Sequence, residues 1–373
     1  MDYFVESPVL VRARDALRMI AEGSTATPKD WDEVLKFVRT GFGPKMFPVG
    51  TQLNVSRGEG VDPYVFDVVD HRTVTDPATS TQKPGMVLML HHAIASKQFD
   101  APEAMYYASE ALAAGTYHFK TSDTSETTYQ FTLTQQVPKG GQIFCDYPDG
   151  QTVLTSRTMK TYSSAASTTV IESAAISEGS EGIDLGICGN ASYPNMNNFS
   201  RCRYGSNNYK ESAARQWINS AAAANAWWAA SNKFDRPASY VSTAGFLNNL
   251  DSSFVAAVRA LDVPCKTNNT FELPGWTKNT AYTVRDKFFL ASRNEVGFGT
   301  ENVAEGTVFS YYNGATNADR IKRSTDGTAR YWWLRSPHPS NAGYVRYVLT
   351  DGSLDGYHAS ITGYAVAPAC VIA

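Results

Sequence analysis

The chain has 373 residues and a formal net charge of −3 at neutral pH. That length is too great for one small core and fits two or three domains, or one domain with a large insertion. The near-neutral charge argues against non-specific nucleic-acid binding, which needs a basic field, and no apolar run approaches the roughly 20 residues that span a bilayer.

Cysteine usage does not indicate a metal or redox centre. The cysteines are widely spaced and form no CxxC pair, so we expect neither a zinc ribbon nor a thioredoxin-type site. We expect mostly buried free thiols, with a Cys188–Cys202 bridge as an open alternative. The N-terminal residues 1–7 are acidic and contain no basic segment, so no signal peptide is expected. The cysteines are Cys145, Cys188, Cys202, Cys265 and Cys370.

Two helices are predicted in the N-terminal segment, residues 1–45. The first spans residues 7–23 and has Pro8 at its first position. The second begins at a Thr27 cap and ends at Gly41, with acids in its first turn and bases in its last. We interpret this pair as packing on the following sheet or as mediating assembly. The apolar stripe of the second helix is Trp31, Val34, Leu35 and Val38.

Strands are predicted next. Residues 52–55 and 64–70 alternate in polarity, and residues 86–90 form a continuous apolar run, which is typical of a strand buried on both faces. His91 and His92 follow directly. Because side chains alternate along a strand, we expect these two on opposite faces. Since no third ligand stands at a suitable spacing, we expect no metal site there.

Short strands separated by turn signals follow, about ten residues apart, a spacing that fits a small antiparallel sandwich. We therefore predict an inserted antiparallel β-sandwich over residues 112–181. The predicted strands are residues 115–119, 129–134, 141–145 and 168–172.

Beyond this insertion the pattern becomes helical and aromatic. Helices are predicted at residues 207–219, 244–249 and 252–261. Residues 286–292 predict a buried strand, followed by a turn or short helix at 293–296, and the polar, Gly- and Asn-rich residues 300–328 predict a loop.

The C-terminal segment has the composition of a binding surface. Stiff apolar runs at residues 331–337 and 366–373 enclose a stretch rich in Asn, Gly, Tyr and Ser, and Asp351-Gly352 predicts a hairpin turn. Tyrosine offers large contact area with little rotamer entropy to lose. The alternative is that these tyrosines are half-buried strand residues. The best candidates for ligand anchors are Tyr344, Tyr347, Tyr357 and Tyr364. We expect these residues to be scaffold: Trp332, Trp333, Leu334, Arg335, Pro337 and Pro368, with Arg335 a buried cation that ties loop carbonyls together.

The order of several motifs resembles the DUF6273 family. The motifs are the strand at 64–69, residues 85–90, Arg215-Gln216-Trp217-Ile218-Asn219, the run 286–295, the run 331–337 and the run 365–369. The resemblance covers roughly residues 47–100 and 183–373. It implies an α+β protein with a C-type-lectin-like fold, related to the formylglycine-generating-enzyme architecture. That domain would be discontinuous, at residues 46–111 and 182–373, on either side of the inserted sandwich.

Many proteins of this type are similar to the variable proteins of diversity-generating retroelements in phages and prophages. There, error-prone reverse transcription changes residues at the C-terminal end of a fixed lectin-type backbone. The resemblance implies a ligand-binding, variable surface at Ser340, Asn341, Ala342, Gly343, Tyr344, Tyr347, Leu349, Asp355, Tyr357, His358, Ser360, Ile361 and Tyr364.

No complete catalytic constellation is present in the sequence. Motifs such as GxSxG, HExxH and the P-loop are absent, and the terminal region holds only Cys370 where oxidase relatives use a cysteine pair or a copper-type site. We therefore expect a non-enzymatic protein without cofactor or metal.

The resemblance implies a receptor-binding or virion protein of a phage or prophage, located on the tail or capsid surface, that binds a bacterial surface protein or glycan. We expect no nucleic-acid partner and no membrane insertion, and a homo-oligomer such as a trimer is an analogy at the level of fold. Two alternatives stay open: a bacterial surface glycan-binding lectin, and a purely structural virion protein.

Overall fold

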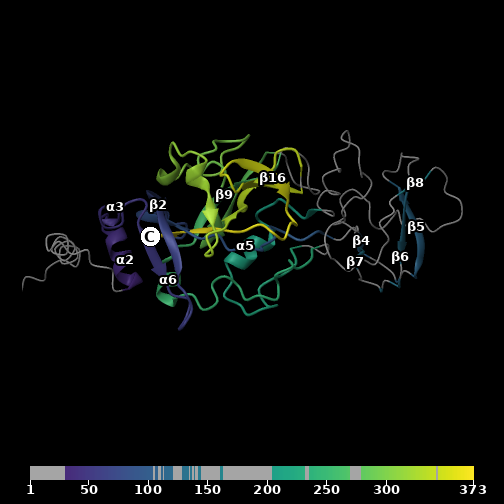
Figure 1. The fold of residues 1–373 in the computed structure, drawn as a ribbon, viewed down its shortest axis with the longest axis horizontal. Helices are drawn as coiled ribbons and strands as arrows, with labels where there is room; N and C mark the ends of the chain where they lie inside the picture. The colour runs from purple at the N-terminus through teal and green to yellow at the C-terminus, as the bar shows by residue number, and fades with distance from the viewer. Residues whose placement is uncertain are drawn as a thin grey trace, which may run out of the picture.

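The computed structural model describes residues 30–103, 204–231, 235–268, 279–341 and 343–373, with short pieces between 106 and 162. These residues form a mixed α+β structure of mostly antiparallel sheets with few helices (Figure 1). The predicted helix at 7–23 and the predicted strand at 168–172 lie outside the described residues.

The centre of the fold is a five-stranded antiparallel sheet in the order β1-β2-β3-β17-β11. The chain's last strand therefore lies between β3 and β11, so segments from both ends of the described chain share one sheet. The strand predicted at 52–55 is confirmed with its predicted bounds, those at 64–70 and 86–90 are longer than predicted, and the one at 286–292 is confirmed in part. Their bounds are β1 (Gln52–Val55), β2 (Tyr64–Thr75), β3 (Gln82–Leu90), β11 (Phe288–Leu290) and β17 (Pro368–Ile372).

A short helical layer packs against this sheet (Figure 1). It consists of α2 (Trp31–Arg39), α3 (Gly43–Met46) and α6 (Ser252–Ala257). The Trp31 and Phe254 rings lie 4.5 Å apart and join α2 to α6.

The second predicted helix is confirmed, but the prediction that Thr27 caps it is wrong. Asp30 is the N-cap, because its extended backbone lets its carboxylate accept a hydrogen bond from the Glu33 N–H at 2.9 Å. The buried face also differs from the predicted stripe, since Phe37 takes the place of the partly buried Leu35.

The helix predicted at 207–219 is confirmed only as α5 (Ala213–Ile218), which Ser212 caps. The helix predicted at 244–249 is wrong. The N–H groups of Gly245, Phe246 and Leu247 donate to carbonyls of residues 217–222, so tertiary contacts use the donors that a helix would need.

The helix predicted at 252–261 ends early, at Ala257. From Leu261 the chain forms β9 (Leu261–Lys266), which pairs antiparallel with β10 (Ala281–Asp286). The sequence analysis missed this two-stranded sheet. The predicted turn at 293–296 is confirmed. Residues 300–328 are mostly loop, as predicted, and contain the short 3-10 helices η2 (Ser310–Tyr312) and η3 (Ala318–Arg320). Near the end of this loop, β12 (Lys322–Arg323) pairs with β13 (Ala329–Arg330).

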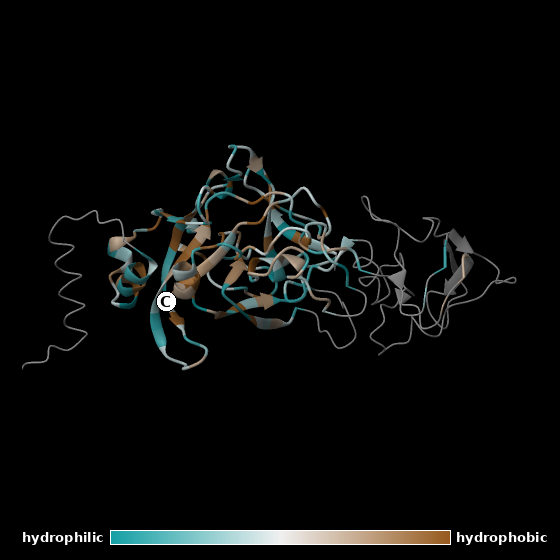
Figure 2. Ribbon diagram, turned by 90° about the horizontal axis from the view of Figure 1, so that it is seen from below, coloured by the Kyte–Doolittle hydropathy of each residue, from teal (hydrophilic) through white to brown (hydrophobic). Residues whose placement is uncertain are grey.

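The C-terminal segment forms a second antiparallel sheet, in the order β14-β15-β16. Its strands are β14 (Trp332–Pro337), β15 (Tyr344–Val348) and β16 (Leu354–His358). The hairpin predicted around Asp351-Gly352 is confirmed as β15–β16. Backbone bonds from Trp333 N–H to Ala365 O and from Arg335 N–H to Ala291 O, both 2.9 Å, attach β14 to neighbouring segments. Figure 2 shows hydrophobic residues concentrated on strands inside this body.

The elements that the structure describes within the predicted insertion, residues 112–181, are strands. β5 (Gly115–Lys120), β6 (Thr128–Leu133) and β8 (Lys160–Tyr162) form one antiparallel sheet. β7 (Gln142–Ile143) pairs with β4 (Tyr106–Tyr107), which lies before the predicted insertion. Strands predicted at 115–119 and 129–134 are confirmed, and that at 141–145 in part. The sandwich as a whole lies partly outside the described residues and stays a prediction.

The β15–β16 turn is packed closely against the loop that contains Asn317. Gly352 has φ +82°, and a Cβ added there would lie 1.7 Å from the Asn317 carbonyl oxygen. Gly327 has nearly the same φ, +83°, with no atom within 4 Å of an added Cβ.

We expect Gly327→Ala to lose about 1 kcal/mol of unfolding free energy from the left-handed backbone alone. Gly352→Ala should lose clearly more, because the turn must also move away. Urea unfolding of both variants measures the difference, and equal losses would contradict the close packing.

Candidate functional site

Six rings gather on the second sheet and beside it, and we call them the tyrosine cluster. Tyr364 is central: its ring centroid lies 4.6 Å from Tyr347, 5.0 Å from Tyr331 and 6.0 Å from Tyr357. β15 and β16 supply most of the other rings, and short segments next to β14 and β17 supply the rest. The members are Tyr331, Tyr344, Tyr347, Tyr357, His358 and Tyr364.

His358 connects the cluster to the Tyr204 ring. Its Nε2 lies 2.9 Å from the Tyr344 hydroxyl oxygen, and its ring stacks on Tyr357 at 4.6 Å and on Tyr204 at 3.7 Å. The sequence analysis did not single out Tyr204 or Tyr331. Neither lies in the run of predicted variable positions, and only the fold brings their rings to this surface.

Exposure divides the cluster into an inner and an outer layer. Tyr357 and Tyr331 are 39 % and 38 % exposed, whereas Tyr347 is 5 % exposed and packs on Trp333 at 5.9 Å. Tyr344, His358 and Tyr364 are half-buried. Burial raises the pKa of Tyr347 and of Tyr364 above the usual range, so both hydroxyls stay protonated at neutral pH.

The remaining predicted ligand positions also differ in exposure. Ser340 and Asp355 are exposed, and Asn341, Leu349 and Ile361 are half-buried. Gly343 and Ser360 are buried, so neither residue is exposed to a ligand at the surface. Ala342 lies outside the described residues.

The expected scaffold residues lie under the cluster. Trp332 and Trp333 are fully buried, and their indole N–H groups donate to Arg320 O at 3.0 Å and to Lys97 O at 2.9 Å. Leu334, Pro337 and Pro368 are also buried. Both tryptophans thus have satisfied donors, which a buried indole requires.

Arg335 is fully buried and ties several segments together. It donates to the carbonyls of Pro264 at 2.8 Å, Leu290 at 2.8 Å and Glu305 at 3.0 Å. Two further N–H groups reach the Glu295 carboxylate, at 2.5 and 2.9 Å. The planar guanidinium therefore makes the bidentate carboxylate pair for which arginine is suited, and it leaves no ligand-binding capacity.

The loop before β15 is held by a residue that the sequence analysis missed as a site residue. Asn207 is fully buried and its side-chain amide donates to Asn341 O at 2.8 Å and to Tyr344 O at 2.9 Å. At the neighbouring hairpin strand, a Cβ on Gly356 would lie 2.6 Å from the His338 ring. The only sequence signal for Asn207 is a polar run ahead of α5, which does not distinguish a buried anchor from an exposed cap.

Motifs that carried the family resemblance contact one another. Arg215, in the motif at residues 215–219, makes a bidentate pair with Asp286, in the run 286–295, at 2.7 and 2.8 Å. The Asn219 side chain donates to Phe288 O and accepts from Phe288 N–H. These side chains therefore join α5 to β11 and are engaged in structure.

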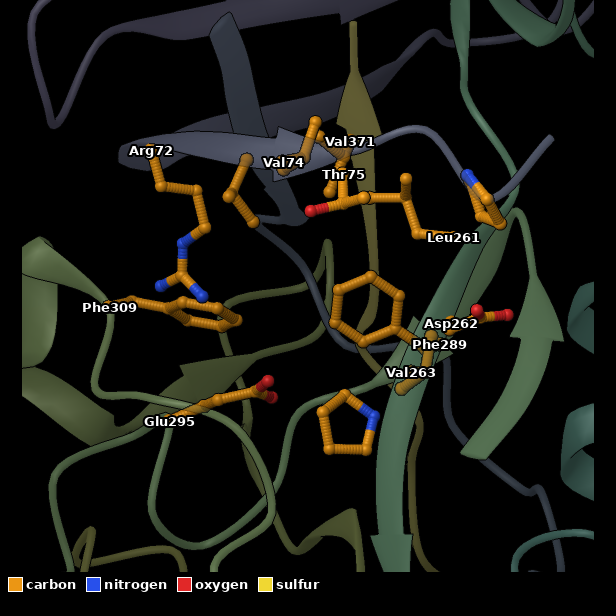
Figure 3. A pocket seen from close by; sticks show the side chains of 13 residues that line it. Arg72, Val74, Thr75, Leu261, Asp262, Val263, Phe289, Glu295, Phe309 and Val371 are labelled. Carbon is orange, nitrogen blue, oxygen red and sulfur yellow. The ribbon is translucent and has the colours of Figure 1, made fainter. Parts of the chain in front are cut away.

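A cavity of about 280 Å³ lies between the large sheet and β9, away from the tyrosine cluster (Figure 3). Its walls are mostly apolar, with Phe289 and Phe309 prominent, and the Arg72 guanidinium lies over the Phe309 ring at 5.0 Å. Arg72 pairs with Asp70, and the Glu295 carboxylate at the wall belongs to Arg335. Its internal charges are thus already neutralised, and the sequence analysis did not predict it.

The expectation that His91 and His92 lie on opposite faces is wrong. Their ring centroids are 4.6 Å apart, because β3 ends at Leu90 and the chain bends there. His91 Nδ1 lies 2.8 Å from the Asp67 carboxylate.

Over the part of the chain that the structure describes, no group of three or more His, Cys, Asp or Glu could hold a metal ion. Cys265 and Cys370 are buried free thiols, and the other cysteines lie outside those residues. No helix among the described elements is long and apolar enough to cross a membrane.

Comparison with known proteins finds one family. The model of a domain of unknown function, DUF6273, matches residues 149–373. No curated protein and no solved structure matches the chain. The matched range contains the tyrosine cluster, Arg335 and Glu295, whereas β1 to β3 lie before it and still complete the large sheet.

The Arg335–Glu295 pair gives a direct test of this framework. Arg335→Met leaves a buried carboxylate without its cation, so we expect a loss of about 3–5 kcal/mol in unfolding free energy. The double variant Arg335→Met/Glu295→Gln removes both charges and should recover part of that loss. Urea unfolding of the two variants measures it. A double variant no more stable than the single one would show that the pair is not what holds these segments.

Proposed function

The chain belongs to the DUF6273 family, and we propose that its domain is a ligand-binding display module whose tyrosine cluster recognises a partner molecule. The observation that carries this proposal is the continuous set of ring contacts from buried Trp333 through Tyr347 and Tyr364 to exposed Tyr357 and Tyr331. Rings held in place before binding lose little entropy on binding, so they suit an anchor surface.

The display role follows from the separation of frame and surface. Trp332, Trp333 and Arg335 are buried and bonded to backbone carbonyls, whereas Asp355 and Tyr357 alternate outwards on β16. Outward side chains on such a strand can be replaced without disturbing the core. Positions such as Tyr347 and Ser360 are part of the packed interior, so we place variation mainly at the outer positions.

We extend the proposal to the protein's biological setting. On the resemblance set out above, the module has a C-type-lectin-type fold and is the variable protein of a diversity-generating retroelement. It is then a receptor-binding or virion protein of a phage or prophage, and its partner is a bacterial surface protein or glycan. A bacterial glycan-binding lectin would use the same surface and differs in the class of ligand bound.

Binding measurements on matched tyrosines test the surface. Tyr357 is 39 % exposed within the cluster, and Tyr311, in η2, is 41 % exposed outside it. We expect Tyr357→Ala to weaken binding to intact cells from a bacterial panel, or to an arrayed glycan, by about tenfold or more, as for an interface anchor. Tyr311→Ala should bind like the unmodified chain. If both variants bind equally well, the cluster is not the binding surface.

The gene itself tests diversification. We expect a reverse-transcriptase gene nearby and a second copy of the segment encoding residues 335–370 that differs only at adenines. The differences should fall on codons for outer positions such as Asp355 and Tyr357. Sequencing the locus in several isolates measures this, and a locus with neither repeat nor variation rejects the retroelement part of the proposal while leaving the binding part to the cell and glycan assays.

A further inference from the structure

A groove runs along β1. Two helices that line it, α2 and α6, lie at the end of the described body away from β16 (Figure 1). Its volume is about 530 Å³. It is lined by helix α2, strand β1, the loop at residues 61–63 and the start of α6. The tyrosine cluster contributes no residue to it. It is therefore a second, separate surface of the molecule.

β1 is an edge strand. It pairs with β2 on one side, and within the ranges described above no strand pairs with its other side. Val68 N–H donates to Thr51 O at 2.8 Å, and His91 N–H donates to Val65 O at 2.8 Å. In an antiparallel ladder, hydrogen-bonded and non-hydrogen-bonded residue pairs alternate. Because the Thr51 backbone is hydrogen-bonded to β2, the backbones of Leu53 and Val55, two and four residues further on, are hydrogen-bonded to β2 as well.

The backbone N–H and C=O groups of Gln52 and Asn54 consequently point away from β2. Both residues line the groove and both are exposed. A row of such groups is a template for an added strand. The row is short, because Asp251 N–H donates to Ser56 O at 3.0 Å and covers the chain just beyond β1.

The groove combines apolar walls with negative charge. Trp31, Val34 and half-buried Leu53 form the apolar part, and Val61 at the rim is 48 % exposed. Asp30 and Asp251 also line it, and no lining residue is basic. Each of these two carboxylates caps a helix, and hydrogen bonds from Ser253 lower the pKa of Asp251 below its usual value.

We propose that this groove binds an extended, basic segment of another protein, which adds as a strand to the free edge of β1. The added backbone would satisfy Gln52 and Asn54, its apolar side chains would cover Val61 and Leu53, and its lysine or arginine side chains would face Asp30 and Asp251. This mode of recognition combines main-chain hydrogen bonds with pockets for alternate side chains. Pairing with β1 of a second copy is disfavoured, because its own Asp30 and Asp251 would approach these two.

A substitution at Asn54 isolates the backbone contact. Asn54→Pro removes the N–H that points into the groove and leaves the bonds of Leu53 and Val55 to β2 in place, and proline is tolerated at such edge positions. Asn54→Ala keeps the N–H and is the matched control. We expect both variants to unfold at nearly the same urea concentration. Leu53→Pro, which removes a bond to β2, should be destabilised.

The binding probe is a short, amidated, fluorescein-labelled peptide of alternating lysine and valine, titrated against the full chain by anisotropy. We expect Asn54→Ala to bind like the unmodified chain and Asn54→Pro to bind about tenfold more weakly. A double variant, Asp30→Asn/Asp251→Asn, keeps both helix caps, since asparagine caps as well as aspartate. It should bind about threefold more weakly at low salt and equal the unmodified chain at high salt.

Amide exchange gives an independent readout. The N–H groups of Gln52 and Asn54 should exchange freely in the free chain and become protected with the peptide. The proposal is overturned if the unmodified chain does not bind the peptide, if a glutamate–valine peptide binds as well, or if Asn54→Pro binds like Asn54→Ala. It is also overturned if these amides are already protected in the free chain, which means that another segment or a second copy occupies the edge.

Discussion

The buried pair of Arg335 and Glu295 is the interaction on which the relative position of the two sheets depends. Arg335 belongs to β14, yet its donors reach carbonyls within β9, at the end of β11 and in the loop at residue 305. A charge taken out of water is tolerated only where its partner and its remaining donors are all satisfied. Few arrangements of these segments meet that condition at once, so the pair selects one placement of β14 against the large sheet.

This placement determines where the rings stand. β14 carries Trp333, on which Tyr347 packs, and Tyr364 in turn packs on Tyr347. The cluster is therefore supported from the core outwards, and its outer rings extend a rigid interior. The groove along β1 lies at the other end of the same body (Figure 1). The groove and the tyrosine cluster share no residue.

Local patterns predicted those features whose cause is local. The continuous apolar run at Met86–Leu90 became the fully buried part of β3, and Asp351-Gly352 became the turn of a hairpin. Arg335, between tryptophans and a proline in an apolar run, was identifiable as a buried cation. In the segment 244–249, by contrast, helical propensity lost to backbone hydrogen bonds that the segment donates to carbonyls of residues 217–222. β9 and β10 alternate in polarity over only a few residues each, and the sequence analysis did not interpret them as strands. Those outcomes depend on partners far away in the chain.

The candidate site divides in the same way. The sequence alone determined that the C-terminal segment would hold many tyrosines on a hairpin between rigid ends, because composition and turn chemistry are properties of consecutive residues. Only the tertiary structure decided that Tyr347 faces inwards and Tyr357 outwards and that Tyr331 joins the cluster. It also decided that Tyr204 stacks on His358 and that Asn207 holds the loop before β15. The physical reason is that burial and ring contacts depend on which distant segments pack together, and patterns of consecutive residues do not specify this packing.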